Sequence, residues 1–356
     1  MTATDLRRMV GRKDISPVEI VEASIERIET TDPSLNAVVT KNYEGARKAA
    51  KAAEKDVLDG EMLGLLHGLP IGIKDLEATA GLRTTLGSLL YADHVTTTDQ
   101  GAVRNVREAG GIILGKTNTP EFGAGANTRN LLFGATGNPF NPAKTCGGSS
   151  GGSAVALAAG MVSLASGSDY GGSLRTPAGF CGVVGIRPSP GIVAAETRPV
   201  GLLPFSVLGP MGRTVEDANL LLQAQMGPNP HDPFSTMFLD ELTQPLEPAD
   251  LGCIRAMLSA DFGIAAMSND YRKIFSERVK IFQHHFAHAF TGNPDFTHGD
   301  NAFEVLRGVN FVAAHGGRVR NHRDELSPNV VDNVDRALSY SLSDVAEAHL
   351  QQTQIV

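Results

Sequence analysis

The chain of 356 residues is 42% hydrophobic and 20% charged, with a formal net charge of -8. That composition predicts a globular protein with a large core, built as one large α/β domain or two ordinary ones. The acidic balance disfavours direct nucleic-acid binding, which usually needs a basic patch. We therefore expect a small-molecule partner.

The N-terminus carries no apolar segment behind its basic residues, and the apolar run 153–167 is too short and too rich in serine to cross a bilayer. The three cysteines, Cys146, Cys181 and Cys253, are scattered and lack metal-ligand spacing, which is typical of reduced thiols. These features predict a cytoplasmic protein without a membrane segment, a disulfide or a bound metal.

The first sixty residues are predicted to form a helical arm. Ser16 is placed as an N-cap and Pro17 as the first helical residue, so a helix is expected over 17–30. Residues 36–40 indicate a short strand, and 43–57 indicate a solvated helix.

Strands and helices are then predicted to alternate, as they do in a sheet covered by helices. The expected strands are 68–75, 111–115, 161–166 and 183–187, and the expected helices are 101–109, 153–160 and 214–225. Beyond residue 227 the chain is expected to be mainly helical. A helix over roughly 269–290 would place an aromatic stripe in a core.

Three motifs have a structural alternative that we favour. GGIILGKT at 110–117 fits the spacing of a phosphate-binding loop, but its apolar residues look like a strand. GGSSG at 147–151 fits a nucleophile elbow centred on Ser149, but no strand precedes it. His284 and His288 have a spacing that can hold a metal, but no third ligand accompanies them, so we interpret them as surface or packing residues.

A second segment, ASGSDYGGSLRTPAGFCGVVGIRPS, places Ser173 after two glycines, between an expected strand and a short helix-compatible run. The amides of Tyr170, Gly171, Gly172 and Ser173 could then point at one spot, as amides do in an anion-binding nest. An oxyanion needs such a set of donors.

A serine nucleophile at Ser173 needs a neighbouring base, and no histidine lies nearby in the sequence. Lys74 is the candidate because it ends the apolar run LPIGI. Burial of its stem would lower its pKa from about 10.4 toward that of a useful base. The alternative interpretation is a solvated lysine at the end of a strand.

Five segments resemble, in order, the blocks of the amidase signature family. They are GLPIGIKD, LGKTNTPEFG, FGATGNPFNP, GGSSGGSA and GSDYGGSLRTPAGFCGVVGIRPS, within roughly residues 17–226. The resemblance implies an α/β fold with a central mixed β-sheet covered by helices on both faces and, here, a shortened C-terminal part. We expect one domain over 1–356, with a helical arm at 1–60, a catalytic core at 61–226 and a mainly helical part at 227–356.

The resemblance also implies a triad. By position in the blocks, Ser173 is the expected nucleophile, Ser149 the bridging serine after a cis peptide bond, and Lys74 the base. A carboxylic amide would be cleaved through an acyl-enzyme on Ser173, with Ser149 and Lys74 as the proton relay, the amides of 170–173 as the oxyanion hole, and no cofactor.

Two further features concern the surroundings of this triad. Asp169 and Arg175 flank the expected nucleophile and could form a pair that fixes its loop. Gly123 lies where the family places part of its acyl pocket, so Gly123 and Ser149 are the expected substrate-binding residues.

The expected activity is therefore that of an amidase acting on linear carbon–nitrogen bonds, with an aryl or small aliphatic amide as substrate. Two alternatives stay open. One is the glutamine-hydrolysing subunit of an aminoacyl-tRNA amidotransferase, which needs a partner subunit; the other is a truncated, non-catalytic amidase homologue. A homodimer also stays open.

Overall fold

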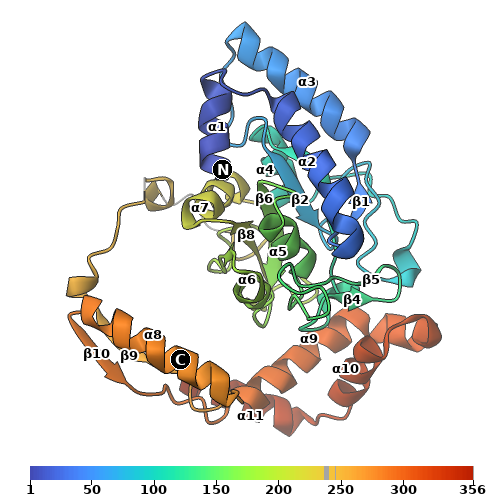
Figure 1. Ribbon diagram of the computed structural model, residues 1–356. Helices are drawn as coiled ribbons and strands as arrows, with labels where there is room; N and C mark the ends of the chain where they lie inside the picture. The colour runs from blue at the N-terminus through green and yellow to red at the C-terminus, as the bar shows by residue number, and fades with distance from the viewer. Residues whose placement is uncertain (236–239, 245, 356) are drawn as a thin grey trace. The chain divides into compact units, whose positions relative to one another are not determined.

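The structure is a computed structural model that describes residues 1–235, 240–244 and 246–355. These residues group into two compact units, one of Met1–Gln244 with Arg318–Val331 and the other of Pro245–Gly317 with Asp332–Val356 (Figure 1). The expectation of a single domain over 1–356 stays a prediction.

The first unit is built on a six-stranded sheet with the strand order β1-β3-β2-β6-β8-β7. Its strands are β1 (Val38–Lys41), β2 (Pro70–Lys74), β3 (Ile112–Thr117), β6 (Leu164–Asp169), β7 (Val184–Gly185) and β8 (Val207–Gly212). Strand β2 is parallel to β3 and β6, whereas β1 and β8 run antiparallel to their neighbours. The sheet is therefore mixed, as expected. A separate hairpin joins β4 (Arg129–Asn130) to β5 (Gly134–Ala135).

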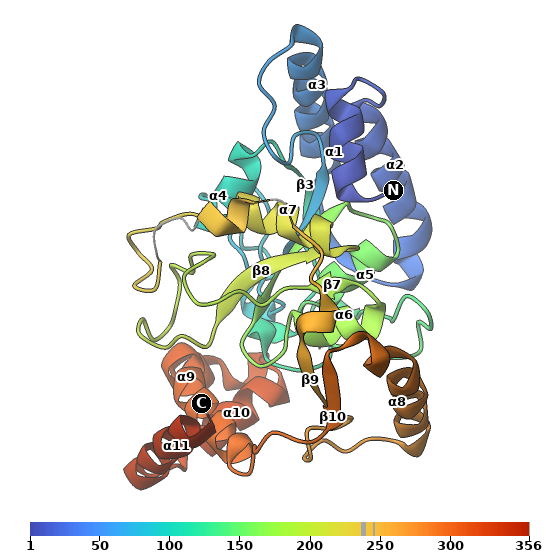
Figure 2. The ribbon, with the colours of Figure 1, turned by 90° about the vertical axis from the view of Figure 1, so that its left-hand side faces the viewer.

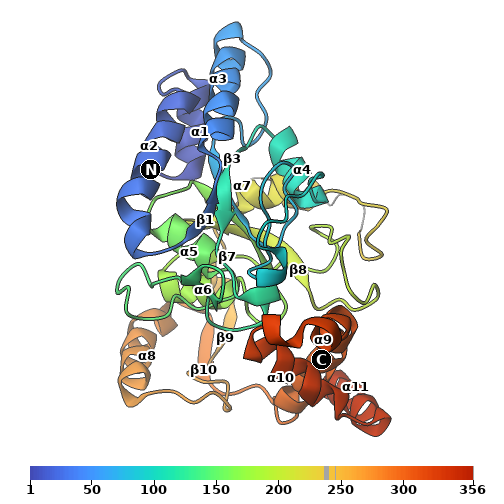
Figure 3. The same ribbon diagram turned by 90° about the vertical axis from the view of Figure 1, so that its right-hand side faces the viewer.

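Helices cover both faces of this sheet. They are α1 (Ala3–Gly11), α2 (Pro17–Thr31), α3 (Tyr43–Asp59), α4 (Gly101–Glu108), α5 (Gly151–Ala158), α6 (Arg175–Cys181) and α7 (Val215–Gln225). One apolar cluster joins α2, α3, α5 and α6 to the sheet, and a second joins α1, α4 and α7. Figure 3 shows α2 and α5 on one side of the strands and α4 on the other.

Alternation along a strand explains why one sheet serves both clusters. In β3, Ile112 and Leu114 belong to the first cluster and Ile113 to the second. Successive side chains of a strand point to opposite faces. An uninterrupted apolar run therefore indicates a strand that is buried on both sides.

Local signals set the ends of several elements as predicted. Helix α2 begins at Pro17, where the Ser16 hydroxyl accepts from the Val18 amide and the Glu19 carboxylate accepts from the Ser16 amide. This reciprocal capping satisfies amides that the first helical turn leaves unpaired. The predictions for β1, α3, β2, α4, β3, α5, β6 and α7 are confirmed to within a few residues.

Strand β8 was not predicted from the sequence. Its residues VLGPMG contain a Gly-Pro pair, which normally marks a turn. Pro210 nevertheless lies in the strand opposite Ser166 of β6, and its carbonyl accepts from the Ile186 amide. The tertiary pairing thus overrides the local turn signal.

The second unit contains α8 (Asn269–Phe282), α11 (Leu342–Ile355) and most of α9 (Gly299–His322) and α10 (Pro328–Leu338). It also contains two parallel strands, β9 (Arg255–Leu258) and β10 (His288–Thr291), which lie side by side in Figure 2.

The expected helix over 269–290 is therefore wrong beyond Phe282. Residues 288–291 pair with β9, with α8 as the crossover between the two strands. The aromatic stripe is also not a core in this structure, because Tyr271, Phe282 and Phe290 are exposed. In the part of the chain that is described, no helix combines the length and apolarity needed to span a bilayer.

The buried residues of β2 should dominate the stability of the first unit. We expect Ile71→Ala to lower the free energy of unfolding by about 2–5 kcal/mol, because the fully buried side chain leaves a cavity. Urea titration followed by circular dichroism measures this change. Leu202→Ala, at an exposed position of the same unit, is the control and should leave the transition unchanged.

Candidate active site

The side chain of Lys74 is buried between neighbouring strands. Lys74 is the last residue of β2 and is fully inaccessible to solvent. Strand β6 runs parallel beside it, and the register pairs Ile71 with Leu164 and Gly72 with Ala165. The carboxyl ends of β2 and β6 therefore lie together at one edge of the sheet. This is the edge at which open α/β sheets usually bind ligands.

Three hydroxyl groups surround the Lys74 amine. Nζ lies 2.7 Å from Ser149 Oγ, 2.9 Å from Ser150 Oγ and 2.9 Å from Ser168 Oγ. An ammonium group has three N–H donors, so these three acceptors satisfy it completely. A neutral amine has one lone pair and can accept a proton from one of the same hydroxyls. The surroundings of Lys74 therefore suit both of its protonation states.

Burial makes the neutral form of Lys74 accessible. Removal of the amine from water lowers the pKa of Lys74 to about 7, while the carboxylates of Glu77 and Asp169 act in the opposite direction. A desolvated amine holds its proton less tightly because the charged form loses hydration. At neutral pH, Lys74 can thus take up or release a proton.

Ser149 and Ser150 lie immediately before helix α5. The peptide bond between Gly148 and Ser149 is cis, as the resemblance implied. Both serines are buried. The Ser150 amide donates to the carbonyl oxygen of Ser173 at 3.1 Å. This bond ties the loop that carries Ser149 to the loop that carries Ser173.

Ser173 lies between β6 and α6 and is half-buried. Asp169, fully buried at the end of β6, organises this loop. Its carboxylate accepts from the amides of Gly172 at 2.8 Å and Leu174 at 3.0 Å. The amides on both sides of Ser173 are therefore held by one carboxylate.

Two guanidinium groups complete the surroundings of Asp169. Arg175 Nη2 lies 3.1 Å and Arg187 Nη1 3.2 Å from its Oδ1 atom. The expected pair of Asp169 and Arg175 is thus present, although the Arg175 side chain is 56% exposed. Burial alone would raise the pKa of Asp169, but the hydrogen bonds from Arg175, Gly172 and Leu174 outweigh it and lower the pKa to about 2.

The expected set of four oxyanion donors needs one correction. The Gly172 amide is engaged by Asp169, so it is not available to a substrate oxygen. Within the described residues, the amides of Gly171 and Ser173 have no protein acceptor. Tyr170, the remaining member, packs its ring against Phe205 with centroids 5.7 Å apart.

Gly123 lies next to Ser149, and its expected role in substrate binding stays a prediction. A Cβ atom built on Gly123 would lie 3.5 Å from Ser149 Oγ and 2.9 Å from the Leu76 side chain, and its φ of +72° also favours glycine. The neighbouring Glu121 is buried and accepts from Ser88 Oγ at 2.6 Å and from the Ser327 amide at 2.7 Å. Glu121 therefore fastens the Gly123 loop to the segment around Ser327.

The structure supports the interpretation of the three motifs. Residues 112–117 form strand β3, and Lys116 is buried rather than placed in a phosphate loop. No strand runs directly into Ser149, so 147–151 is not a strand-to-helix elbow. His284 and His288 do not share a helix, because His284 lies in a short 3₁₀ turn and His288 in β10.

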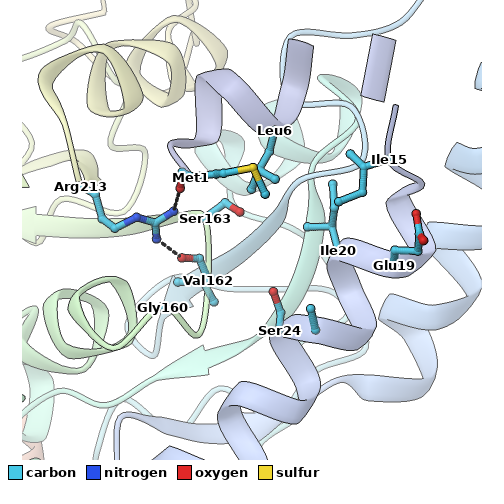
Figure 4. A pocket seen from close by; sticks show the side chains of 11 residues that line it. Met1, Leu6, Ile15, Glu19, Ile20, Ser24, Gly160, Val162, Ser163 and Arg213 are labelled. Carbon is cyan, nitrogen blue, oxygen red and sulfur yellow. Dashed lines mark hydrogen bonds between the residues drawn. The ribbon is translucent and has the colours of Figure 1, made fainter. Parts of the chain in front are cut away.

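A cavity of about 320 Å³ lies elsewhere in the first unit (Figure 4). It is lined by residues of α1 and α2 and their flanks, by residues 160–163 just before β6, and by Arg213. The Arg213 guanidinium donates to the carbonyls of Val162 at 2.9 Å and Met1 at 2.8 Å, and Glu19 caps α2. Its charged groups are thus committed to backbone atoms. None of its lining residues belongs to the Lys74 cluster.

Four residues around Lys74 were not anticipated from the sequence. Ser150 and Ser168 bind the side-chain amine directly, whereas Glu77 reaches the backbone amide of Lys74 through Ser166. Ser150 stands next to Ser149 in GGSSGG, and Ser168 is two residues from the end of an expected strand. Only the spatial position of Lys74 distinguishes them from other serines.

The Asp169 contacts should contribute to stability in a pH-dependent way. We expect Asp169→Asn to lower the free energy of unfolding at pH 7 by about 2 kcal/mol, which corresponds to the lowered pKa. A lowered carboxyl pKa stabilises the fold above the unfolded value of about 3.9, and this contribution is lost as pH falls toward 2.

The difference in free energy of unfolding between Asp169→Asn and the unaltered chain, measured by urea titration, should consequently shrink between pH 4 and pH 2. Asp14→Asn, at an exposed aspartate, is the control. A constant difference across this pH range would contradict the role given to the Asp169 charge.

Known proteins share this sequence and fold. The acylamidase of Rhodococcus erythropolis is 36% identical over 283 residues, which cover 80% of this chain and 59% of that protein. A glutamyl-tRNA(Gln) amidotransferase subunit of Thermus thermophilus is 40% identical over 291 residues, covering 80% of this chain and 58% of that protein. This chain thus spans about three fifths of the length of these relatives.

A solved bacterial aryl acylamidase of the amidase signature family matches the structure with a TM-score of 0.88 and 30% identity. The match covers 99% of this chain and 75% of that one. In addition, residues 19–300 match the sequence profile of the family Amidase. With this match over most of its length, and with the mixed sheet that carries the Lys74 cluster, the chain belongs to the Amidase family.

Proposed function

We propose that this chain is an amidohydrolase that cleaves a carboxylic amide through an acyl-enzyme on Ser173. The observation that carries the proposal is the Lys74 amine, buried and within 3 Å of three serine hydroxyls, with a pKa lowered to about 7. A base with such a pKa is suited to proton transfer at neutral pH. The names of the relatives, an acylamidase and an aryl acylamidase, support an amide substrate.

Proton transfer would start with neutral Lys74. Ser149 gives its hydroxyl proton to Nζ and takes the proton of Ser173, while Ser173 Oγ forms a bond to the carbonyl carbon of the amide. Ser149 is suited to this relay because it lies 2.7 Å from Nζ, whereas the Ser150 hydroxyl donates to the Ser168 carbonyl. The tetrahedral intermediate then carries a negative oxygen.

The amides of Gly171 and Ser173 are the donors that we assign to this oxygen. They lie in the loop that Asp169 holds, so their directions are set before the substrate arrives. Donors fixed in advance stabilise the developing charge without reorganisation. The carbon–nitrogen bond then breaks, and the proton stored on Lys74 returns through Ser149 to the leaving amine.

Water completes the reaction by the same relay. It loses a proton through Ser149 to Lys74 and attacks the ester carbonyl, and Ser173 recovers its proton as the acid product leaves. Gly123 and Ser149 would line the acyl side of the site, since Gly123 leaves space beside Ser149 Oγ.

Glutamine is a second candidate substrate. The similarity to a glutamyl-tRNA(Gln) amidotransferase subunit, at 40% identity, favours it. Turnover of glutamine, an aryl anilide and an aliphatic amide by the purified chain alone separates the two candidates. An enzyme specialised for ammonia transfer should favour glutamine and respond to a partner subunit.

Substitution of the triad should abolish covalent labelling and turnover. A fluorophosphonate probe should modify Ser173, as located by peptide mass mapping, and Ser173→Ala should remove the adduct. Lys74→Ala and Ser149→Ala should each reduce the labelling rate by about a thousandfold, because the nucleophile loses its proton acceptor. Ser34→Ala, at an exposed serine, is the matched control. An adduct on Ser149, or turnover by Ser173→Ala, would contradict the proposed roles.

The labelling rate should also depend on pH through Lys74. Only the neutral amine accepts a proton, so the rate should rise with pH and level off above the pKa of about 7. Between pH 6 and pH 8 the expected increase is about tenfold. Stopped labelling assays across this range measure it. A flat profile would exclude a lysine base with this pKa.

A further inference from the structure

Glu77 is a buried carboxyl group that the proposed reaction does not use. It lies three residues after Lys74 and is 1% exposed. Its Oε1 atom accepts from Ser166 Oγ at 2.6 Å. Its Oε2 atom is buried and has no hydrogen-bond partner among the described residues. A carboxyl group with an unpaired oxygen is costly to bury, which suggests that Glu77 has a function beside the strand that ends at Lys74.

Ser166 connects Glu77 to Lys74. The Ser166 hydroxyl donates to Glu77 and accepts from the backbone amide of Lys74 at 3.0 Å. The paired register of β2 and β6 ends at Gly72 and Ala165, just before this point. The Ser166 side chain thus joins the strands where the Lys74 amine enters the space beside β6. Glu77 fixes the direction of this hydroxyl, because the carboxylate accepts its hydrogen bond and a lone pair on Ser166 Oγ is left for the Lys74 amide.

The carboxyl group also acts on Lys74 by its charge. The charges of Glu77 and Asp169 act on the pKa of Lys74, and those of Lys74 and Lys116 act on the pKa of Glu77. The pKa of Lys116 is in turn affected by the charges of Asp75, Glu77, Asp99 and Arg107. Burial raises the pKa of Glu77 to about 7, although the hydrogen bond from Ser166 and the charges of Lys116 and Lys74 lower it. In turn, ionised Glu77 raises the pKa of Lys74.

A purely structural role as a partner of Lys116 does not account for this arrangement. Lys116 Nζ donates to the backbone carbonyl of Glu77 and to Thr79 Oγ1, rather than to the Glu77 carboxylate. The first of these contacts would persist whatever side chain stood at position 77. The carboxyl group itself is directed to Ser166.

We propose that Glu77 is a positioning residue for the catalytic base: it orients Ser166 to hold the Lys74 backbone, and its negative charge sets how readily Lys74 takes up a proton. This inference rests on the proposed function of Lys74. It assigns two separable effects to one side chain. Glutamine at position 77 removes the charge and keeps an acceptor for Ser166, whereas alanine at position 166 removes the bridge and leaves the carboxyl group in place.

The test measures the rate at which a fluorophosphonate probe labels Ser173 between pH 5 and pH 9. In this reaction Ser173 Oγ bonds to phosphorus, fluoride leaves, and the proton passes to Lys74. For Glu77→Gln we expect the acidic limb of the curve of labelling rate against pH to move to lower pH by at least half a unit. The shift should be largest near and above pH 7, because burial raises the pKa of Glu77 to about 7 and its carboxyl group is charged only there. For Ser166→Ala we expect the plateau to fall about tenfold.

Asp32→Asn is the matched control, because Asp32 is a buried carboxyl group that binds the amides of Ala37 and Val38, outside the Lys74 cluster. Its limb should stay in place. An unmoved limb in Glu77→Gln overturns the charge effect, and an undiminished plateau in Ser166→Ala overturns the bridge.

Circular dichroism establishes that each variant is folded; if Glu77→Gln does not fold, Glu77→Asp, with a shorter reach to Ser166, must lower the plateau. Failure of the proposed function is recognised separately, because the probe would then label Ser173 at the same rate in the unaltered chain and in Lys74→Ala.

Discussion

The site depends on one buried amine. Lys74 ends a strand that is covered on both faces, so its Nζ atom has no water to replace a lost partner. The three serine hydroxyls come from the loop before α5 and from β6, and each must therefore stay within hydrogen-bonding distance for the fold to tolerate the lysine. The same requirement that stabilises the protein brings Ser149 to the base. The hydrogen bonds that allow the Lys74 amine to be buried are thus the same contacts that the proposed proton transfer would use.

A carboxylate performs a comparable task for the loop of Ser173, the proposed nucleophile. Asp169 binds the amides before and after Ser173 and two guanidinium groups, so the loop is held by charge-assisted bonds rather than by apolar packing. Ser173 is thus half-buried while the backbone on both sides of it is held in place. The bond from the Ser150 amide to the Ser173 carbonyl joins this loop to the one that carries Ser149. The loops of the two serines are consequently linked to each other through their backbones.

The sequence predicted the central sheet well because its strands are short apolar runs bounded by glycine and charge. Lys74, Ser149 and Ser173 were identified from the order of the family's blocks, and their spatial convergence could not follow from spacing alone. Three kinds of feature escaped. Strand β8 was missed because it contains Pro210, and the end of α8 at Phe282 was missed because aromatic residues continue at helical spacing beyond it. The hydrogen bond from the Gly172 amide to Asp169 depends on the conformation of a loop. Each is decided by a tertiary partner far away in the sequence or by exact loop geometry.

The absence of a side chain at Gly123 has a consequence for how this site can change. In the proposed reaction, an acyl group that approaches Ser149 from this direction meets no side chain at position 123, where a φ of +72° favours glycine and a Cβ atom would require the Leu76 side chain to shift. Substitution of Gly123 would therefore strain its loop, which limits how the proposed acyl side of the site can vary at this position. Diversification must come from the segments that hold the Gly123 loop in place, such as the one that reaches Glu121 through the Ser327 amide. Evolution of a new substrate range would proceed by exchanging these supports while the proton relay stays intact.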